Sequence, residues 1–309
     1  MCPKPSVWYD LKIPTMTIRH HLSLFAACSL IAISSSAHGT DETAIVEIEG
    51  KSIPEASGMV SSIIHRDVIW IVNDGPAGTV LHAVSQEGKI HGAVSVTGIR
   101  TSDVEDLASF AWNGKPHLLI ADVGDNSSRK RFYTLHAVPE PSPTARTAKP
   151  SWSLRFRYED GPHNCESLAI DQDKGEILIV TKGKKAGIYS LPLAPAKELV
   201  IAKSKGEVIW GRPKLDTPNA LRHIVTGSLA TGMDFSPDGR IAAILTYSHV
   251  CLYPRKDGET WDVSFKNAPE ILKIPSFSQA EAIAFSPDGR SIWVASENLP
   301  AKMAKIPVP

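Results

Sequence analysis

Short apolar runs recur along the chain from about residue 44 onward, and residues typical of tight turns separate them. Two of these turns have the same six residues, Phe235–Arg240 and Phe285–Arg290, fifty positions apart. In each copy Pro presets φ, Asp caps the turn through its side chain, and Gly takes the positive φ that closes a hairpin. Each copy therefore predicts a strand, a tight turn and a second strand.

The same pattern can be followed through five copies, and such an internal repeat predicts a repeat architecture. Successive copies begin 48, 61, 65 and 50 residues apart, a spacing that suits the blades of a β-propeller. First strands are expected at Ser57–Val60, Glu105–Ala108, Glu166–Ala169, Thr231–Asp234 and Glu281–Ala284. Second strands are expected at Val68–Val72, His117–Ala121, Glu176–Val180, Ile241–Leu245 and Ser291–Ala295, and third strands at Val80–Val84, Phe132–Val138, Gly187–Leu191, Val250–Tyr253 and Met303–Val308.

A fourth strand fits four of the copies, and the fifth copy ends with the chain. The missing strand is expected at Ala44–Glu49, an alternating segment that would pair beside the last strands and close the ring without an open edge at the seam. The prediction is an all-β protein, a single β-propeller of about five four-stranded blades. The other fourth strands are expected at Ala93–Thr97, Trp152–Tyr158, Glu207–Trp210 and Pro269–Ile274.

The repeated turns resemble those of bacterial WD40-like propellers of the TolB-associated type. The resemblance extends to secreted bacterial propellers without assigned activity, over about residues 44 to 309, through Val104–Ala108, Ala121–Asn126, Val225–Asp234 and Gln279–Ala284. The resemblance implies the fold and no particular activity. The Trp-Asp dipeptide of eukaryotic WD40 blades is absent at the expected strand end, so a scaffold role is not implied.

The first 39 residues are interpreted as upstream residues followed by a signal peptide, with Met16 as the start. A basic stretch with Arg19 precedes the twelve-residue apolar run Leu22–Ile33, and small residues then offer cleavage after Ala37 or Gly39. That run is too short for a membrane span. A periplasmic or secreted protein is expected, with residues 40–309 as the propeller. An acylated Cys28 would indicate a lipoprotein instead.

Charge and cysteine content narrow the function further. Acidic and basic residues balance at 33 each, so no net field attracts nucleic acid, and none is expected as a partner. After cleavage only Cys165 and Cys251 remain, and they are interpreted as two small buried hydrophobes, with a disulfide as the alternative.

Chemistry is expected at one mouth of the central channel, where first strands begin and second strands end. Asp238 and Asp288 lie in turns at the opposite face and are interpreted as structural. Carboxylates that face one channel repel each other unless a proton, a basic residue or a cation neutralises them. A cation site is therefore predicted, with Ca²⁺ as the expected ion because it binds six to eight oxygens. Alternatively, each Glu accepts hydrogen bonds from the adjoining blade. The expected ligands are Glu105, Asp122, Glu166 and Glu281.

The same mouth is predicted to bind a small polar ligand or an envelope protein. No GxSxG elbow, HExxH pair or P-loop is present in the sequence, which favours binding over catalysis. The alternative is a metal-assisted hydrolase of an ester, a lactone or a phosphoester. The expected ligand-binding residues are Asn73, Asp74, Lys182, Tyr247, His249 and Glu297.

Overall fold

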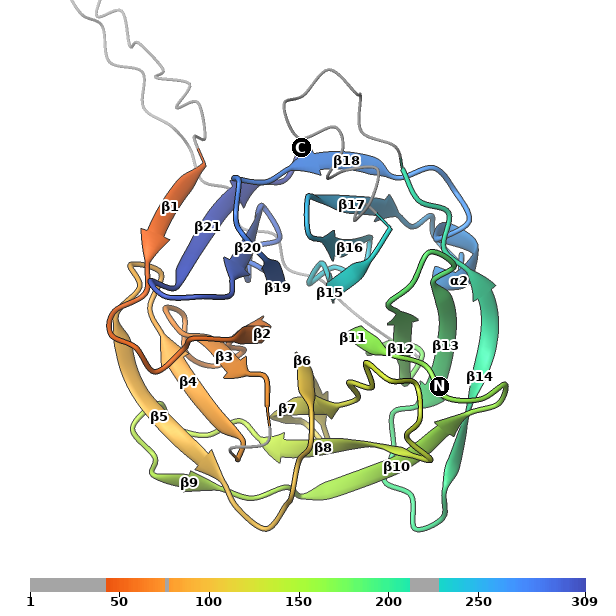
Figure 1. Cartoon of the computed structure of the whole chain (residues 1–309), viewed down its shortest axis with the longest axis horizontal. Helices are drawn as coiled ribbons and strands as arrows, with labels where there is room; N and C mark the ends of the chain where they lie inside the picture. The colour runs from red at the N-terminus through yellow and green to blue at the C-terminus, as the bar shows by residue number, and fades with distance from the viewer. Residues whose placement is uncertain (1–42, 76–77, 212–227) are drawn as a thin grey trace, which may run out of the picture. The chain divides into compact units, whose positions relative to one another are not determined.

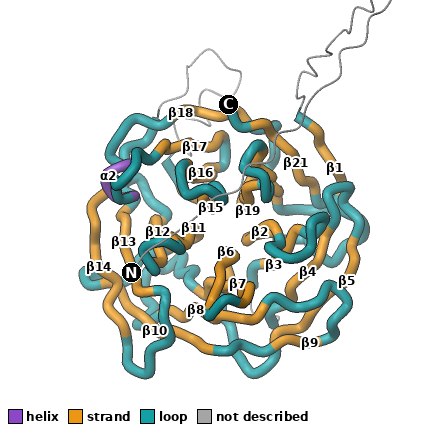
Figure 2. The backbone as a smooth tube through the Cα atoms, turned by 180° about the vertical axis from the view of Figure 1, so that it is seen from behind, coloured by secondary structure: helices purple, strands orange, loops and turns teal. Residues whose placement is uncertain are grey.

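The computed structural model describes residues 43–75, 78–211 and 228–309 of the chain. The expected signal peptide and its cleavage sites lie outside these residues. Residues 40–309 form one compact unit. Its described residues are all-β apart from the one-turn helix α2 (Trp261–Ser264) beside β14 (Figure 2). None of the helices in the described ranges is long and apolar enough to cross a bilayer.

The strands form antiparallel meanders, as the repeat predicted. Within each meander, strands that follow one another along the chain are hydrogen-bonded neighbours in the sheet. The first sheet has β2 (Ala56–Ser61), β3 (Ile69–Asn73), β4 (Val80–Val84), β5 (Ile90–Val96) and β9 (Thr147–Ala148). The fourth-repeat sheet has β15 (Ala230–Phe235), β16 (Ile241–Thr246), β17 (His249–Pro254) and β18 (Glu270–Lys273).

Two further meanders are joined into one eight-stranded sheet. They meet where β10 and β14 run parallel and pair from Phe156 to Tyr158. One meander has β6 (Val104–Trp112), β7 (Lys115–Asp122), β8 (Tyr133–Pro139) and β10 (Trp152–Tyr158). The other has β11 (Cys165–Asp171), β12 (Glu176–Thr181), β13 (Gly187–Pro192) and β14 (Val200–Glu207).

The two ends of the described chain meet in the last sheet. Its strands are β1 (Ala44–Glu47), β21 (Lys302–Pro307), β20 (Ser291–Ser296) and β19 (Ala280–Phe285). β1 pairs antiparallel with β21, with Ala44 opposite Lys305. The pairing predicted for the N-terminal segment is therefore confirmed.

The first strands of the repeats contact one another in a ring, β2 with β6, β6 with β11, β11 with β15, β15 with β19 and β19 with β2 (Figure 1). The arrangement is propeller-like. Side chains join neighbouring inner strands in place of a backbone ladder: Ser57 Oγ donates to Val104 O at 2.7 Å, and Asp106 Oδ2 accepts from Leu168 N at 2.8 Å. Gly58 permits the close approach of β2 and β6, because an added Cβ would lie 2.6 Å from the carbonyl carbon of Asp106.

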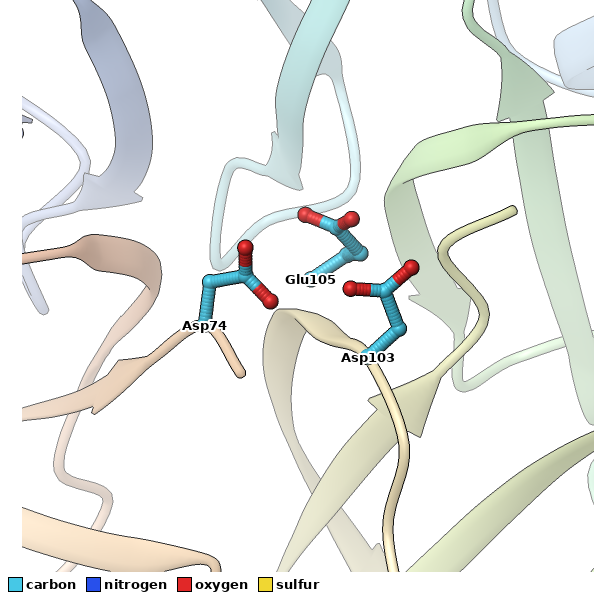
Figure 3. Close-up of side chains that lie close together, drawn as sticks. All are labelled: Asp74, Asp103 and Glu105. Atoms are coloured by element: carbon cyan, nitrogen blue, oxygen red, sulfur yellow. The ribbon is translucent and has the colours of Figure 1, made fainter. Parts of the chain in front are cut away.

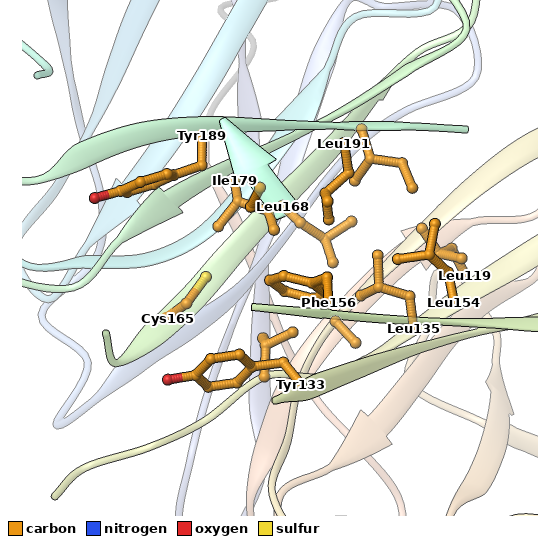
Figure 4. Packing of buried hydrophobic residues seen from close by; sticks show 14 of the residues in the cluster. Leu119, Tyr133, Leu135, Leu154, Phe156, Cys165, Leu168, Ile179, Tyr189 and Leu191 are labelled. Atoms are coloured by element: carbon orange, nitrogen blue, oxygen red, sulfur yellow. The ribbon is translucent and has the colours of Figure 1, made fainter. Parts of the chain in front are cut away.

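Apolar side chains fill the space between adjacent meanders. Figure 4 shows one such layer, in which Tyr133 and Phe156 from one meander pack with Leu168 and Ile179 from the next. These side chains alternate along their strands with residues that face the other way, so every sheet buries side chains on both faces. This two-sided burial explains why the strands read as nearly continuous apolar runs.

One sequence expectation needs correction. The fourth strand of the third repeat was expected at Glu207–Trp210. It lies at Val200–Glu207, where its backbone pairs with β13. Val208 follows this strand and instead donates its N–H to Ala186 O. The connection between β8 and β10 contains β9, which adds a short parallel strand to β5. Cys165 and Cys251 are buried and free, as the preferred interpretation held.

Candidate functional site

The antiparallel register brings two parts of every repeat to the same end of the channel. In each sheet the first residue of the inner strand lies opposite the last residue of the second strand. The pairs are Ala56–Asn73, Val104–Asp122, Cys165–Thr181, Ala230–Thr246 and Ala280–Ser296. The residues beside these pairs therefore form one mouth of the channel, which we call the acidic mouth.

Three carboxylates converge at this mouth from two neighbouring repeats. Asp74 directly follows β3, whereas Asp103 and Glu105 lie at the start of β6 (Figure 3). One oxygen from each carboxylate lies within 4.8 Å of the others. We call these residues the carboxylate cluster. Asp74 and Asp103 are half-buried, whereas Glu105 is only 4% exposed.

The cluster is electrostatically unfavourable when every member is ionised. Burial, followed by the charges of Glu166, Asp74 and Asp103, raises the pKa of Glu105 to about 10. Burial and a hydrogen bond with Asp103 raise the pKa of Asp74 to about 6. Protons or a cation must therefore offset the negative charge near neutral pH.

The surrounding loops hold the cluster in place. Asp122 Oδ1 accepts hydrogen bonds from Ser102 N (3.1 Å), Ser102 Oγ (2.9 Å) and Asp103 N (2.8 Å), which fixes the backbone that carries Asp103. Lys130 Nζ lies 3.9 Å from both Asp103 Oδ2 and Asp122 Oδ1. Gly124 packs against the carboxylates, and an added Cβ would lie 2.5 Å from Asp103 Oδ2.

An internal ammonium group occupies the neighbouring part of the mouth. Lys182 Nζ forms a short ion pair with Glu166 and donates to Tyr247 Oη at 2.6 Å. It also lies 4.8 Å from the centre of the Tyr247 ring. The Glu166 carboxylate raises the pKa of Lys182 although burial opposes this, so Lys182 stays charged. Burial raises the pKa of Glu166, and the ammonium opposes that increase.

The last repeat supplies two more carboxylates. Gln279 Nε2 donates to Glu297 Oε2 at 2.7 Å and to Glu281 Oε1 at 3.3 Å. Burial and the neighbouring Glu281 raise the pKa of Glu297 to about 8. The charges of Asp74 and Glu55 contribute to the same increase, which places this pair close to the first repeat.

Asn73 and His249 have local structural contacts. Asn73 Nδ2 donates to Ser52 O at 2.8 Å, and its Oδ1 accepts from Glu55 N at 3.2 Å. His249 is 1% exposed, with Nδ1 2.9 Å from Ser248 Oγ. Both residues support the loops behind the mouth.

The four carboxylates expected to bind one cation do not form one group in the structure. Of the four expected cation ligands, only Glu105 belongs to a close group of three acidic side chains within the described ranges. Asp122 is engaged by backbone amides, Glu166 by Lys182 and Glu281 by Gln279. Sequence reasoning missed Asp103. Its position two residues before the repeated Glu, on the loop that enters the inner strand, is the signal that would have found it.

The opposite mouth of the channel has a different character. A cavity of about 440 Å³ opens there, lined by the ends of inner strands and by the repeated turns. Asp238 accepts from Ser236 Oγ at 2.6 Å and Asp288 from Ser286 Oγ at 2.6 Å, which confirms their structural role. Arg255 Nη1 pairs with the buried Asp171 at 2.5 Å.

Of the comparisons with known proteins, only the one with solved structures found matches. No protein-family model matches the sequence, and no curated protein matches it. Among solved structures, the chain is similar to one from Bacteroides uniformis named "putative 6-phosphogluconolactonase". The two are 15% identical with a TM-score of 0.42, over 85% of this chain and 70% of the other.

Proposed function

We propose that the protein is a five-bladed, exported propeller that binds a small polar ligand at the acidic mouth. Five meanders with a closed ring of inner strands support the blade count. The signal-peptide pattern in residues 16–39 supports export. The resemblance to TolB-associated propellers supports the propeller fold.

One observation carries the functional proposal: buried, charged side chains gather at the acidic mouth around the Glu166–Lys182–Tyr247 contact. Buried ionisable groups are unfavourable for folding unless paired, and they concentrate at functional sites. At the opposite mouth, by contrast, Asp171 pairs with Arg255, Asp234 accepts hydrogen bonds from two backbone N–H groups, and Asp238 and Asp288 close turns. Convergent polar and ionisable groups of this kind are a common feature of ligand-binding sites.

The balance of charge suggests the class of ligand. Carboxyl groups of Glu105, Glu166, Glu281 and Glu297 face a mouth in which Lys182 is paired with Glu166 and Lys130 lies near Asp103. This excess of carboxyl groups over ammonium groups disfavours phosphate and carboxylate ligands. A neutral polyhydroxylated molecule or an amine can donate hydrogen bonds to the carboxylates, so we expect a ligand of this class.

A thermal-stability screen tests this proposal. Neutral sugars and polyols, primary amines and phosphorylated sugars are added to the purified protein at matched concentrations. We expect stabilisation by a neutral or amine compound, and loss of this effect in Lys182→Met, which leaves Glu166 without its partner. Lys203→Met is the control, because Lys203 is 64% exposed in a surface pair.

Stabilisation by phosphorylated sugars alone would contradict the proposed ligand class. The screen is repeated with ester, lactone and phosphoester substrates and added Ca²⁺. Turnover that Lys182→Met abolishes would favour the metal-assisted hydrolase over the binding protein.

A further inference from the structure

We propose that Asp74, Asp103 and Glu105 bind one hard divalent cation, with Ca²⁺ as the expected ion, which links the first two repeats. The inference deepens the proposed function, because this site adjoins the ligand mouth and would supply its cation. It differs from a ring of one carboxylate per repeat, since all three ligands come from the β3 end and the β6 start (Figure 3).

The burial of Glu105 is the first observation that points to a ligand. Its side chain is 4% exposed and directed at the other two carboxylates. Within the described part of the chain no donor forms a hydrogen bond with it. A buried carboxylate without donors is costly, because it has lost most of its water and gained no partner. A cation among the three oxygens would provide that partner.

A second observation concerns Asp74. Its Oδ1 is shielded from solvent and has no hydrogen-bond partner among the residues described. Asp103 also has only partial compensation, since Lys130 Nζ stays 3.9 Å from its carboxylate and donates to Ser102 Oγ at 2.8 Å instead. The other acids of the mouth differ in this respect, because Glu166 has Lys182 and Glu281 has Gln279.

The chemistry of the donors selects the ion. The site offers carboxylate oxygens and no nitrogen or sulfur ligand, which favours Ca²⁺, Mg²⁺ or Mn²⁺ over Zn²⁺ or Cu²⁺. Three carboxylates provide up to six oxygens when bidentate, and Ca²⁺ takes six to eight ligands in a flexible geometry. Ca²⁺ is therefore expected to bind more tightly than Mg²⁺, which prefers to keep several waters.

Direct binding of the metal alone tests the site. The full chain is stripped with chelator and titrated with Ca²⁺, Mg²⁺ or Mn²⁺ by calorimetry, and Mn²⁺ is counted by paramagnetic resonance. We expect one ion per chain. Asp103→Asn and Glu105→Gln should each weaken Ca²⁺ binding more than about tenfold. Removing a residue that only hydrogen-bonds a metal ligand already causes a loss of about that size, and these two variants change the ligands themselves.

Glu281→Gln is the matched control, because Glu281 occupies the same repeat position as Glu105 and has a hydrogen-bond partner. We expect it to bind Ca²⁺ as the wild type does. Far-ultraviolet circular dichroism of each stripped variant verifies that it is folded before titration.

Two results would overturn the inference. One is a wild-type protein that binds none of the three ions. The other is a site that survives Asp103→Asn but is lost in both Glu105→Gln and Glu281→Gln, which would place the ion in a ring of glutamates. Ligand binding is measured separately in chelator, so failure of the cation site is distinguishable from failure of the proposed function.

Discussion

The two mouths of the channel neutralise their buried charges in different ways. At the acidic mouth, Asp74, Asp103 and Glu105 face one another without a full set of partners. At the opposite mouth, Asp171 pairs with Arg255, whose Nε also donates to Gly239 O at 2.9 Å. The first arrangement leaves negative charge uncompensated, whereas the second pairs a buried carboxylate with a guanidinium group.

This difference arises although both mouths are built from the same repeat. The turns at the opposite mouth are closed by side chains only two or three residues away, such as Asp238 with Ser236. The acidic mouth depends on residues from neighbouring repeats, such as Lys182 with Tyr247. A turn whose hydrogen bonds are all local does not depend on the neighbouring repeats. The polar groups of the acidic mouth, in contrast, are brought together by contacts between repeats.

The largest expected effect is at the opposite mouth. Asp171→Asn should lower the free energy of unfolding by about 3 kcal/mol, because it leaves the buried Arg255 guanidinium without its carboxylate. Denaturant titration measures the change. Asp257→Asn is the control, since the Asp257–Arg240 pair is exposed and should contribute less than about 1 kcal/mol. Equal effects in the two variants would show that the Asp171 pair is not a structural clamp.

A pH dependence is expected from Asp234, which lines the cavity. Burial raises its pKa from 3.8 to about 7, and the N–H groups of Phe285 and Phe235 oppose this increase. Between these values the unfolded chain releases a proton that the folded chain keeps. The free energy of unfolding should therefore fall as pH rises, by up to about 1.4 kcal/mol per pH unit.

Asp234→Asn should reduce that slope when denaturant titrations are repeated between pH 5 and 7. Asp238→Asn should not change it, because Ser236 and the backbone lower the pKa of Asp238 and its titration lies below this window. A slope that is the same in all three proteins would exclude Asp234 as its source.

The smallest effect on stability is expected at the acidic mouth. Gly124→Ala would push the flexible ends of Asp103 and Glu105 apart, so Ca²⁺ affinity should fall about tenfold while the metal-free protein loses less than about 0.5 kcal/mol. Calorimetry and denaturant titration in chelator measure the two quantities. Gly183→Ala is the control, because its added Cβ would meet only Lys185 O at 3.8 Å. Unchanged Ca²⁺ binding in Gly124→Ala would place the ion elsewhere.

Much of the strand order could be predicted from the sequence, because turn chemistry and alternation are local. The repeated turns located β15 with β16 and β19 with β20 to within a residue or two. The fourth strands were harder to locate, as β14 shows. An outer strand is half-exposed, so its apolar pattern is weak. A buried apolar residue nearby, such as Val208, can then be mistaken for part of the strand.

The candidate site was predicted only in part. The sequence placed Glu105, Glu166 and Glu281 at one repeat position, and the structure places all three at the acidic mouth. Their partners could not be inferred, because Lys182 and Gln279 belong to different parts of their repeats and the choice depends on side-chain reach. Asp103 escaped notice because it lies on a loop before the repeated strand.

The sequence by itself determined the all-β class, the meanders and the pairing of β1 with the last strand, since these follow from backbone periodicity and short turns. Tertiary structure decided which carboxylates meet and which are neutralised. Asp74 and Asp103 are 29 residues apart by their numbering and come together only because β2 packs against β6 in the ring. Electrostatic interaction depends on distance and burial in the folded chain, and neither is encoded in the local pattern of residues.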